Sequence, residues 1–371
     1  MRRIWDYAKL VGALGLVFLM LLWPAEALSA AQGAMRTWAG SVGPSLFPFL
    51  ALLPMLTAPA ARCVYARALG WLMRPLFRLP GSAAPALLIG LLAGSPAGAL
   101  AVERVSEGMP RGEARRLGLM CAGVSPVYLV GGVGAALFGS AAMGVWLALA
   151  QAAGQLLLGV ALRGRFAEDA EPLPALPERE REAPVRAAVG SVLQVCGYMA
   201  LFSVAAAMAA KLLGGAAGDL LLYIADMPSG LARAAQKGAP WALAGAVAGF
   251  GGLCIAAQNM AVLRQLGVRW RDYLAARGFV AAVCALALQL RFPAPAAEAA
   301  MARLETGALE TSTLAAMLLL LPALLAVACD GHACAREKIK LLTNQNCWQK
   351  RAQNGPKPRY TGGLEDVEGK I

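Results

Sequence analysis

Residues 82–104 read SAAPALLIGLLAGSPAGALAVER, an apolar run that is interrupted at Gly94, Ser95 and Pro96 and then continues as an alanine-rich stretch. A helix needs about 20 apolar residues to span the hydrocarbon of a bilayer. A break at membrane depth is tolerated only where protein or a water-filled cavity surrounds the backbone. The stretch therefore predicts a re-entrant helical hairpin over 82–101, with its tip at residues 94–98, in an all-α polytopic membrane protein.

The composition of the whole chain favours the same class. Of the 371 residues 58% are hydrophobic and 15% are charged, whereas soluble proteins average roughly 25% charged residues. The 41 glycines suit helices that pack closely in lipid. These values exclude an ordinary soluble enzyme, and we expect no enzymatic activity.

Charge, histidine and cysteine content restrict the partners. The net charge of +12 fits the anionic face of a lipid bilayer, and without a soluble basic domain nucleic acid is not an expected partner. The one histidine, His332, excludes a buried Ser-His-Asp triad and a site built from several histidines. The eight cysteines are scattered without a CxxC motif and are interpreted as packing residues. We therefore expect no cofactor, no metal and no disulfide.

Apolar stretches long enough to span a membrane recur along the chain. The clear ones are 7–28, 117–138, 141–162, 187–213, 239–262 and 312–329, and four shorter or broken ones are 41–60, 82–101, 219–235 and 275–292. The first stretch also resembles a secretory signal, although a retained helix is favoured over a cleaved one.

Composition divides the chain into five parts. The predicted parts are an N-terminal transmembrane helix and loop at 1–40, a first membrane half at 41–162, a charged linker at 163–186, a second membrane half at 187–330 and a basic flexible tail at 331–371.

The two predicted halves share a weak internal repeat. AGSPAGALAVER at 93–104 is followed by Gly108, and AGFGGLCIAAQN at 248–259 is followed by Gly267, so the offset is 155 residues at the breaks and 159 at the glycines. Such self-similarity is typical of duplicated transporter halves. It predicts a second hairpin near 239–262, the alternative being glycines that only permit close packing or a kink.

A helix that starts inside a membrane presents unpaired N–H groups and a partial positive charge, which suits a carboxylate or a phosphate. The breaks therefore predict a small anionic substrate. Polar side chains at membrane depth support an internal site: Gln258 and Asn259 follow the second break, and Gln194 with Tyr198, like Gln151 with Gln155, share a helix face. Interhelical hydrogen bonding explains Gln151, Gln155 and Gln194 equally well. Glu103 and Arg104 are interpreted as interfacial, with a role in the site as the alternative.

Six motifs in order resemble the YlbJ (SpoVV) family of sporulation integral membrane proteins, which carries the nucleoside-recognition Gate domain. They are Trp38, VGPSLFPF at 42–49, PLFRLPG at 75–81, GSPAGA at 94–99, CAGVSPVYLVGGVG at 121–134 and GFGGLCIAAQ at 249–258. The resemblance implies two related halves with re-entrant hairpins, distantly similar to concentrative nucleoside transporters. It also implies transport of dipicolinic acid across the outer forespore membrane, and hence a bacterial cell-membrane location.

Three positions depart from the family pattern and leave the identity of the anion open. Ser95 stands where the family usually has tyrosine, Leu100 where it has lysine, and Ala122 where it has asparagine. Nucleoside or other metabolite transport, and a non-transporting role in spore-envelope assembly, are the alternatives. The coupling ion and the oligomeric state, a homo-oligomer included, also stay open.

The candidate substrate-binding residues lie at the two breaks and beside them. They are Gly94, Ser95, Pro96, Gly98, Ser125, Gly249, Gly251, Gly252, Gln258 and Asn259.

The orientation of the second half poses a conflict. Basic loops prefer the inside of a membrane, but an inverted second hairpin would place Arg264, Arg269, Arg271 and Arg277 outside. If residues 219–235 cross completely, the charge rule is kept and the inversion is lost. The resemblance favours inversion. Asp226, with Arg233 and Lys237 nearby, is interpreted as part of an interfacial segment.

Overall fold

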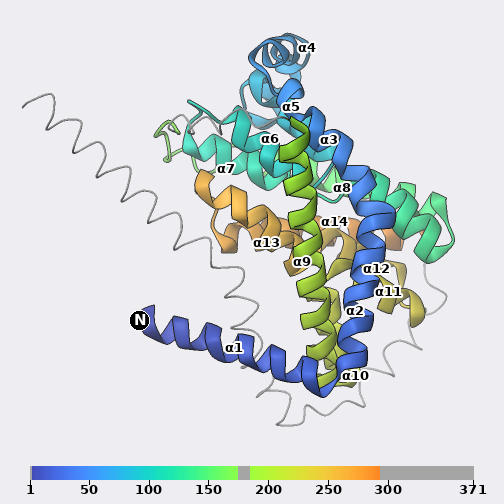
Figure 1. The fold of residues 1–371 in the computed structure, drawn as a ribbon. Coiled ribbons are helices and arrows are strands. Elements are labelled where there is room, and N and C mark those ends of the chain that lie inside the picture. The colour runs from blue at the N-terminus through green and yellow to red at the C-terminus, as the bar shows by residue number, and fades with distance from the viewer. Residues whose placement is uncertain (1, 174–183, 293–371) are drawn as a thin grey trace, which may run out of the picture. The chain divides into compact units, whose positions relative to one another are not determined.

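The computed structural model describes residues 2–173 and 184–292, whose regular elements are helices (Figure 1). Within these ranges five helices are long and apolar enough to cross a membrane, and a bent pair brings the number to six when it is counted as one span. The described part of the chain is thus all-helical and of the polytopic membrane class. The five are Pro24–Leu56, Ala141–Ala161, Pro184–Leu213, Trp241–Leu266 and Trp270–Arg291.

The N-terminal helices differ from those predicted. Helix α1 (Arg2–Leu22) ends before Trp23, so the predicted span 7–28 is divided there. The cause is Pro24, which cannot donate a hydrogen bond and disfavours helical geometry at Trp23 (φ −128°, ψ 64°). The first span, Pro24–Leu56, then runs without a loop through α2 (Pro24–Thr37), the π-helix η1 (Trp38–Val42) and α3 (Gly43–Leu56), taking in most of the predicted segment 41–60.

A helical hairpin follows where the sequence predicts one. Helix α4 (Pro59–Phe77) is bent by 104° from the next segment, Gly81–Leu92, which comprises the 3-10 helix η2 (Gly81–Ala83) and α5 (Ala84–Leu92). The chain reverses at residues 93–96, and α6 (Ala97–Val105) packs back against α5. Its insertion into a bilayer remains a prediction.

The predicted continuous span 117–138 is wrong. Helix α7 (Arg111–Met120) stops, residues 121–125 are not helical, and the π-helix η3 (Tyr128–Leu137) begins after them. Pro126 explains the gap, because a proline disfavours helical geometry in the residue before it. Helix α8 (Ala141–Ala161) then forms an uninterrupted span.

Residues 219–235 form neither one crossing helix nor a simple interfacial segment. After the long helix α9 (Pro184–Leu213), α10 (Gly215–Ala225) and α11 (Met227–Gln236) pack side by side and meet at Asp226. The pair is antiparallel, since Arg233 Nε of α11 donates to Asp219 Oδ1 of α10 at 2.6 Å.

The second predicted hairpin, 239–262, is also wrong. Helices α12 (Trp241–Phe250) and α13 (Gly252–Leu263), followed by the 3-10 helix η4 (Arg264–Leu266), make up one span that is interrupted at Gly251. This residue has a φ of +83°, which glycine adopts without steric cost. Helix α14 (Trp270–Arg291) packs along α12 and contains the predicted short segment 275–292 up to Arg291.

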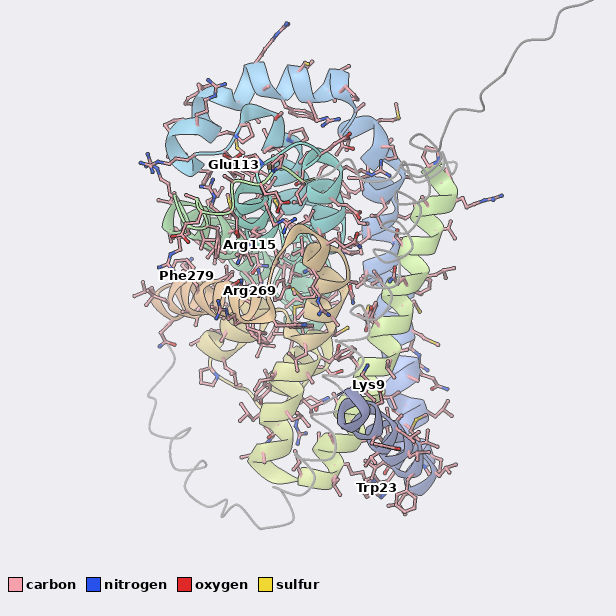
Figure 2. All side chains as sticks on the ribbon, turned by 90° about the vertical axis from the view of Figure 1, so that its left-hand side faces the viewer. Lys9, Trp23, Glu113, Arg115, Arg269 and Phe279 are labelled. Carbon is pink, nitrogen blue, oxygen red and sulfur yellow. The ribbon has the colours of Figure 1, made fainter. Side chains whose placement is uncertain are left out.

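The broken spans α7–η3 and α12–α13 run in opposite directions. Arg115 of α7 pairs with Asp272 at the start of α14 at 3.0 Å, whereas Phe138, just after η3, lies with its ring centroid 5.4 Å from that of Trp241 at the start of α12. The loop with Arg269 therefore lies at the same end as the start of α7. Figure 2 shows Arg115 and Arg269 near each other, away from Trp23.

The predicted linker 163–186 is partly folded against α7. The Arg111 N–H donates to Glu171 O at 2.9 Å, and Arg115 pairs with Asp169 and lies over the ring of Phe166. Residues 174–183 of the linker, the predicted span 312–329, His332 and the tail 331–371 lie outside the described residues.

Candidate functional site

Three breaks in the helices meet inside the molecule, and we call them the break cluster: the non-helical residues 93–96 and 121–125, and Gly251 between α12 and α13. Ser95 joins the first two, because its N–H and its hydroxyl both donate to Gly123 O, at 2.7 and 2.8 Å. On the other side of the same segment, Val124 Cγ2 lies 3.8 Å from the position a Cβ would take on Gly251. The unwound segment 121–125 therefore separates the hairpin tip from the second break.

Asn259 links the hairpin tip to helix α14. Its Nδ2 group donates to Ser95 Oγ and to Tyr273 Oη, both at 2.8 Å, which uses both amide protons. The side chain is fully buried, and its Oδ1 has no hydrogen-bond partner. Asn259 thus holds the tip in place and keeps one buried acceptor unused.

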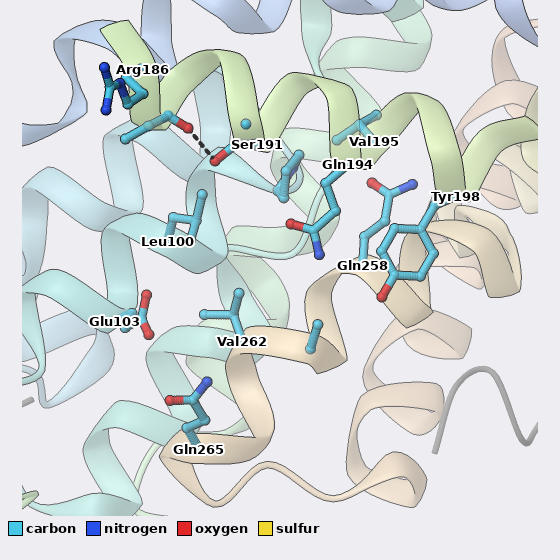
Figure 3. Close-up of a pocket in the computed structure, with 14 residues that line it drawn as sticks. Leu100, Glu103, Arg186, Ser191, Gln194, Val195, Tyr198, Gln258, Val262 and Gln265 are labelled. Atoms are coloured by element: carbon cyan, nitrogen blue, oxygen red, sulfur yellow. Dashed lines mark hydrogen bonds between the residues drawn. The ribbon is translucent and has the colours of Figure 1, made fainter. Parts of the chain in front are cut away.

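A polar cavity of about 610 Å³, the main cavity, lies beside the break cluster between α6, α9 and α13 (Figure 3). Its size is within the usual range for small-molecule sites. Gln194, Tyr198 and Gln258 gather on one side of it in Figure 3, and Glu103 and Gln265 lie on the other. The complete lining is Pro96, Leu100, Glu103, Arg186, Ala187, Gly190, Ser191, Gln194, Val195, Tyr198, Gln258, Ala261, Val262 and Gln265.

A second cavity of about 50 Å³, the small cavity, lies next to the main one and shares Val195 and Gln258 with it. Its polar lining comes from the break cluster and from neighbouring helices, namely Ser45, Ser95, Ser125, Tyr128, Asp226, Cys254 and Gln258. Ser125 Oγ and Asp226 Oδ1 are buried without a hydrogen-bond partner. Two polar atoms in the wall of the small cavity are therefore available to form hydrogen bonds.

The structure divides the predicted site residues into three groups. Pro96 and Gln258 line the main cavity, and Ser95, Ser125 and Gln258 line the small one. The others do not line either cavity. Asn259 holds the hairpin tip. The remaining five are glycines that permit close backbone contacts or a positive φ at a break, namely Gly94, Gly98, Gly249, Gly251 and Gly252.

Some of the amide groups at the first break have backbone partners. The Gly98 N–H donates to Gly94 O at 2.8 Å, and the Ser95 N–H donates to Gly123 O at 2.7 Å. The Leu100 N–H makes the first bond within α6, to Pro96 O at 3.0 Å. An anion at this site would therefore need side chains of the main cavity in addition to the helix end.

Two acidic residues that the sequence places at an interface line the cavities. Glu103, interpreted as interfacial, lines the main cavity. Asp226, also placed at an interface, is 2% exposed and lines the small cavity. In contrast, Gln151 and Gln155 are buried in α8 and line neither cavity, which agrees with a packing role.

Sequence reasoning missed the role of Arg277. This buried guanidinium of α14 donates to the last carbonyls of α12, through Nε to Phe250 O at 3.1 Å and through Nη2 to Gly249 O. Carbonyls at a helix end have no partner within the helix. Arg277 therefore caps the C-terminal end of α12 at the break. The sequence signal for this role is an arginine within an apolar helix.

The chain is similar to one curated protein, the sporulation integral membrane protein YlbJ of Bacillus subtilis (strain 168). The two are 32% identical over 142 residues, which is 38% of this chain and 35% of YlbJ. The match thus spans about a third of the relative's length. No protein-family profile and no solved structure match the chain. The chain is a membrane protein distantly related to a sporulation protein.

Proposed function

We propose that the chain is a membrane transporter that moves a small anionic metabolite. Dipicolinic acid, carried across the outer forespore membrane, is the substrate that the family resemblance implies. The observation that carries the proposal is the main cavity of about 610 Å³, which polar and apolar side chains of two membrane-spanning helices and the first hairpin line next to the break cluster. Non-helical backbone at membrane depth typically marks the binding site of a transporter.

The chemistry of the lining supports a carboxylate guest. The side chains of Gln194, Gln258 and Gln265 offer amide N–H donors, Tyr198 offers a hydroxyl, and Arg186 supplies a cation. A pyridine ring with two carboxylates needs donors on two sides and an apolar surface for the ring. Pro96, Leu100 and Val262 provide that surface.

The order of helices supports duplicated, inverted halves as part of this proposal. A hairpin, a broken span and a long helix occur once as α5–α6, α7–η3 and α8, and again as α10–α11, α12–α13 and α14. Corresponding helices start 129 to 131 residues apart, as Ala84 and Gly215, Ala97 and Met227, Arg111 and Trp241, and Ala141 and Trp270. Repeats of opposite direction are typical of alternating-access carriers.

Nucleoside transport is the second candidate, because the lining is more amide-rich than basic. Glu103 faces the cavity as well as Arg186, and three glutamines can hydrogen-bond to a neutral base or sugar. A nucleoside and dipicolinate differ in charge, so the two candidates separate in a competition assay.

The decisive experiment is uptake of labelled dipicolinate by proteoliposomes that contain the full chain, with unlabelled uridine as competitor. Gln194→Leu and Gln258→Leu each remove a cavity donor, while Gln151→Leu changes a buried glutamine outside it. A hydrogen bond to a charged group contributes about 1.5–3 kcal/mol, so each cavity variant should lower uptake roughly ten- to a hundredfold at low substrate. Gln151→Leu should retain it.

Three results would count against the proposal. Displacement of the label by uridine would favour the nucleoside candidate. Equal uptake by all variants would separate transport from the main cavity. Undiminished dipicolinate in spores that lack the protein would remove this substrate.

A further inference from the structure

Asp226 is a buried carboxylate at the turn of the α10–α11 hairpin. Its Oδ2 accepts hydrogen bonds from the Ser229 N–H at 3.3 Å and from the Ser229 hydroxyl, so the residue caps α11. Its Oδ1 has no hydrogen-bond partner, and the residue is 2% exposed. One oxygen is thus fixed and the other is unused in the wall of the small cavity.

Among the described residues, no cation lines the small cavity that contains Asp226. The titratable side chains that face it are Tyr128 of η3 and Cys254 of α13, while α3 and α9 contribute Ser45, Val195 and Met199 to the same cavity. No ion pair to Asp226 occurs among the described residues. Asp219, on the same hairpin, pairs with Arg233 and Lys237 instead.

A buried carboxylate without a cation favours its neutral form. Burial raises the pKa of Asp226 to about 6, although the hydrogen bonds from the Ser229 hydroxyl and N–H lower it. The small cavity of about 50 Å³ has room for a water molecule that could deliver a proton to Oδ1. Asp226 lies between α10 and α11, outside the five spans.

The turn that holds Asp226 is in direct contact with the second break. Gly252 packs so closely on this turn that a Cβ would lie 2.9 Å from Met227 N and 3.3 Å from Ala225 O. The same helix, α13, carries Gln258 into the main cavity one and a half turns later. A change of charge at Asp226 therefore acts on the helix that lines the proposed substrate site.

We propose that Asp226 is a proton-binding site that links proton movement to transport. A proton from the aqueous phase adds to Oδ1 and converts the carboxylate to a neutral acid, while Ser229 continues to donate to Oδ2. Loss of the charge allows the hairpin turn to pack against α13 in a dry environment, and release of the proton reverses this. The proton site is inferred from the burial of Asp226 and from its unpartnered Oδ1. Its link to substrate rests on the proposed function.

The first experiment is independent of transport. Thermal unfolding of the detergent-solubilised full chain is followed against pH for the wild type, Asp226→Asn and the matched control Asp219→Asn. The pKa of Asp226 is higher in the folded than in the unfolded state, so the wild type should lose stability as pH rises from about 4 to 7. Asp226→Asn should lack this loss, and Asp219→Asn should keep it.

Infrared difference spectra of the same three proteins should show the C=O stretch of a protonated carboxyl that is absent in Asp226→Asn. A pH profile shared by wild type and Asp226→Asn, with no such band, overturns the proton site even if the variant folds normally.

The second experiment measures dipicolinate uptake by proteoliposomes with and without an imposed pH gradient. The gradient should stimulate the wild type and Asp219→Asn severalfold, and Asp226→Asn should transport at one rate in both conditions. Stimulation of Asp226→Asn by the gradient, or dependence of the wild type on sodium alone, overturns the link. No dipicolinate uptake by any protein overturns the proposed function, while the unfolding and infrared results still decide the proton site.

Discussion

At the scale of single residues, some polar side chains face a cavity, and others form hydrogen bonds that hold the broken backbone segments in place. Gln194, Tyr198 and Gln258 could be predicted as internal from sequence, because lipid cannot satisfy an amide or a hydroxyl. Arg277 and Asn259 could not be assigned their roles in this way. Each serves a backbone break whose position depends on how distant helices pack.

Replacing Arg277 tests the closure of α12. Arg277→Met should destabilise the folded protein by about 1–3 kcal/mol for each buried carbonyl left without a donor. The measurement is thermal or chemical unfolding in detergent.

The control for this change is Arg271→Met in the same helix, since the Arg271 side chain is 74% exposed. An exposed substitution changes stability by about 0.5 kcal/mol or less. Equal effects of the two variants would show that Arg277 does not support the break.

At the scale of elements, the first hairpin was predictable and the second was not. Glycine and proline at 94–96 mark a true reversal of the chain, but the similar glycines at 249–252 interrupt a span without reversing it. The predicted offset of 155–159 residues thus matched a hairpin tip with a broken helix. The second hairpin also has a proline and a glycine beside its turn, Pro228 and Gly230 at the start of α11, as Pro96 and Gly98 lie at the start of α6.

Substituting Gly98 tests the packing of the first hairpin. A Cβ at this position would lie 2.8 Å from Gly90 Cα and would press on the Cys121 carbonyl, so only backbone surrounds it. Gly98→Ala should cost about 1–3 kcal/mol of stability through overpacking and should lower uptake.

The matched control is Gly278→Ala in α14, where a Cβ would meet no atom within 4 Å. That variant gains helix propensity, up to about 1 kcal/mol. Normal stability and uptake of Gly98→Ala would contradict the tight contact between α5, α6 and residue 121.

At the scale of the whole molecule, the described helices make the proposed inversion of the two halves compatible with the positive-inside rule. That conflict arose because a second hairpin was assumed at 239–262. Since α12 and α13 form one span, the loop with Arg269 lies beside Arg115 even though α7–η3 and α12–α13 are antiparallel. Sequence could not show this, because local composition does not distinguish a kinked span from a hairpin.

The arrangement of loops predicts their sidedness. In a variant with its native cysteines replaced, Glu107→Cys and Arg269→Cys should react with an impermeant maleimide from one side of sealed vesicles, and Gln236→Cys from the other. All three residues are exposed. Labelling of positions 107 and 269 from opposite sides would contradict the orientation of α13 and α14.

Residues 121–125 are hydrogen-bonded to the hairpin tip and lie close to the second break, where Val124 Cγ2 is 3.8 Å from the position that a Cβ would take on Gly251. A displacement of residues 121–125 by the length of one residue would change the contacts of both the hairpin tip and the break at Gly251. The hairpin tip and the break at Gly251 therefore adjoin the same five residues. We expect that a change of backbone conformation at one of them moves the other.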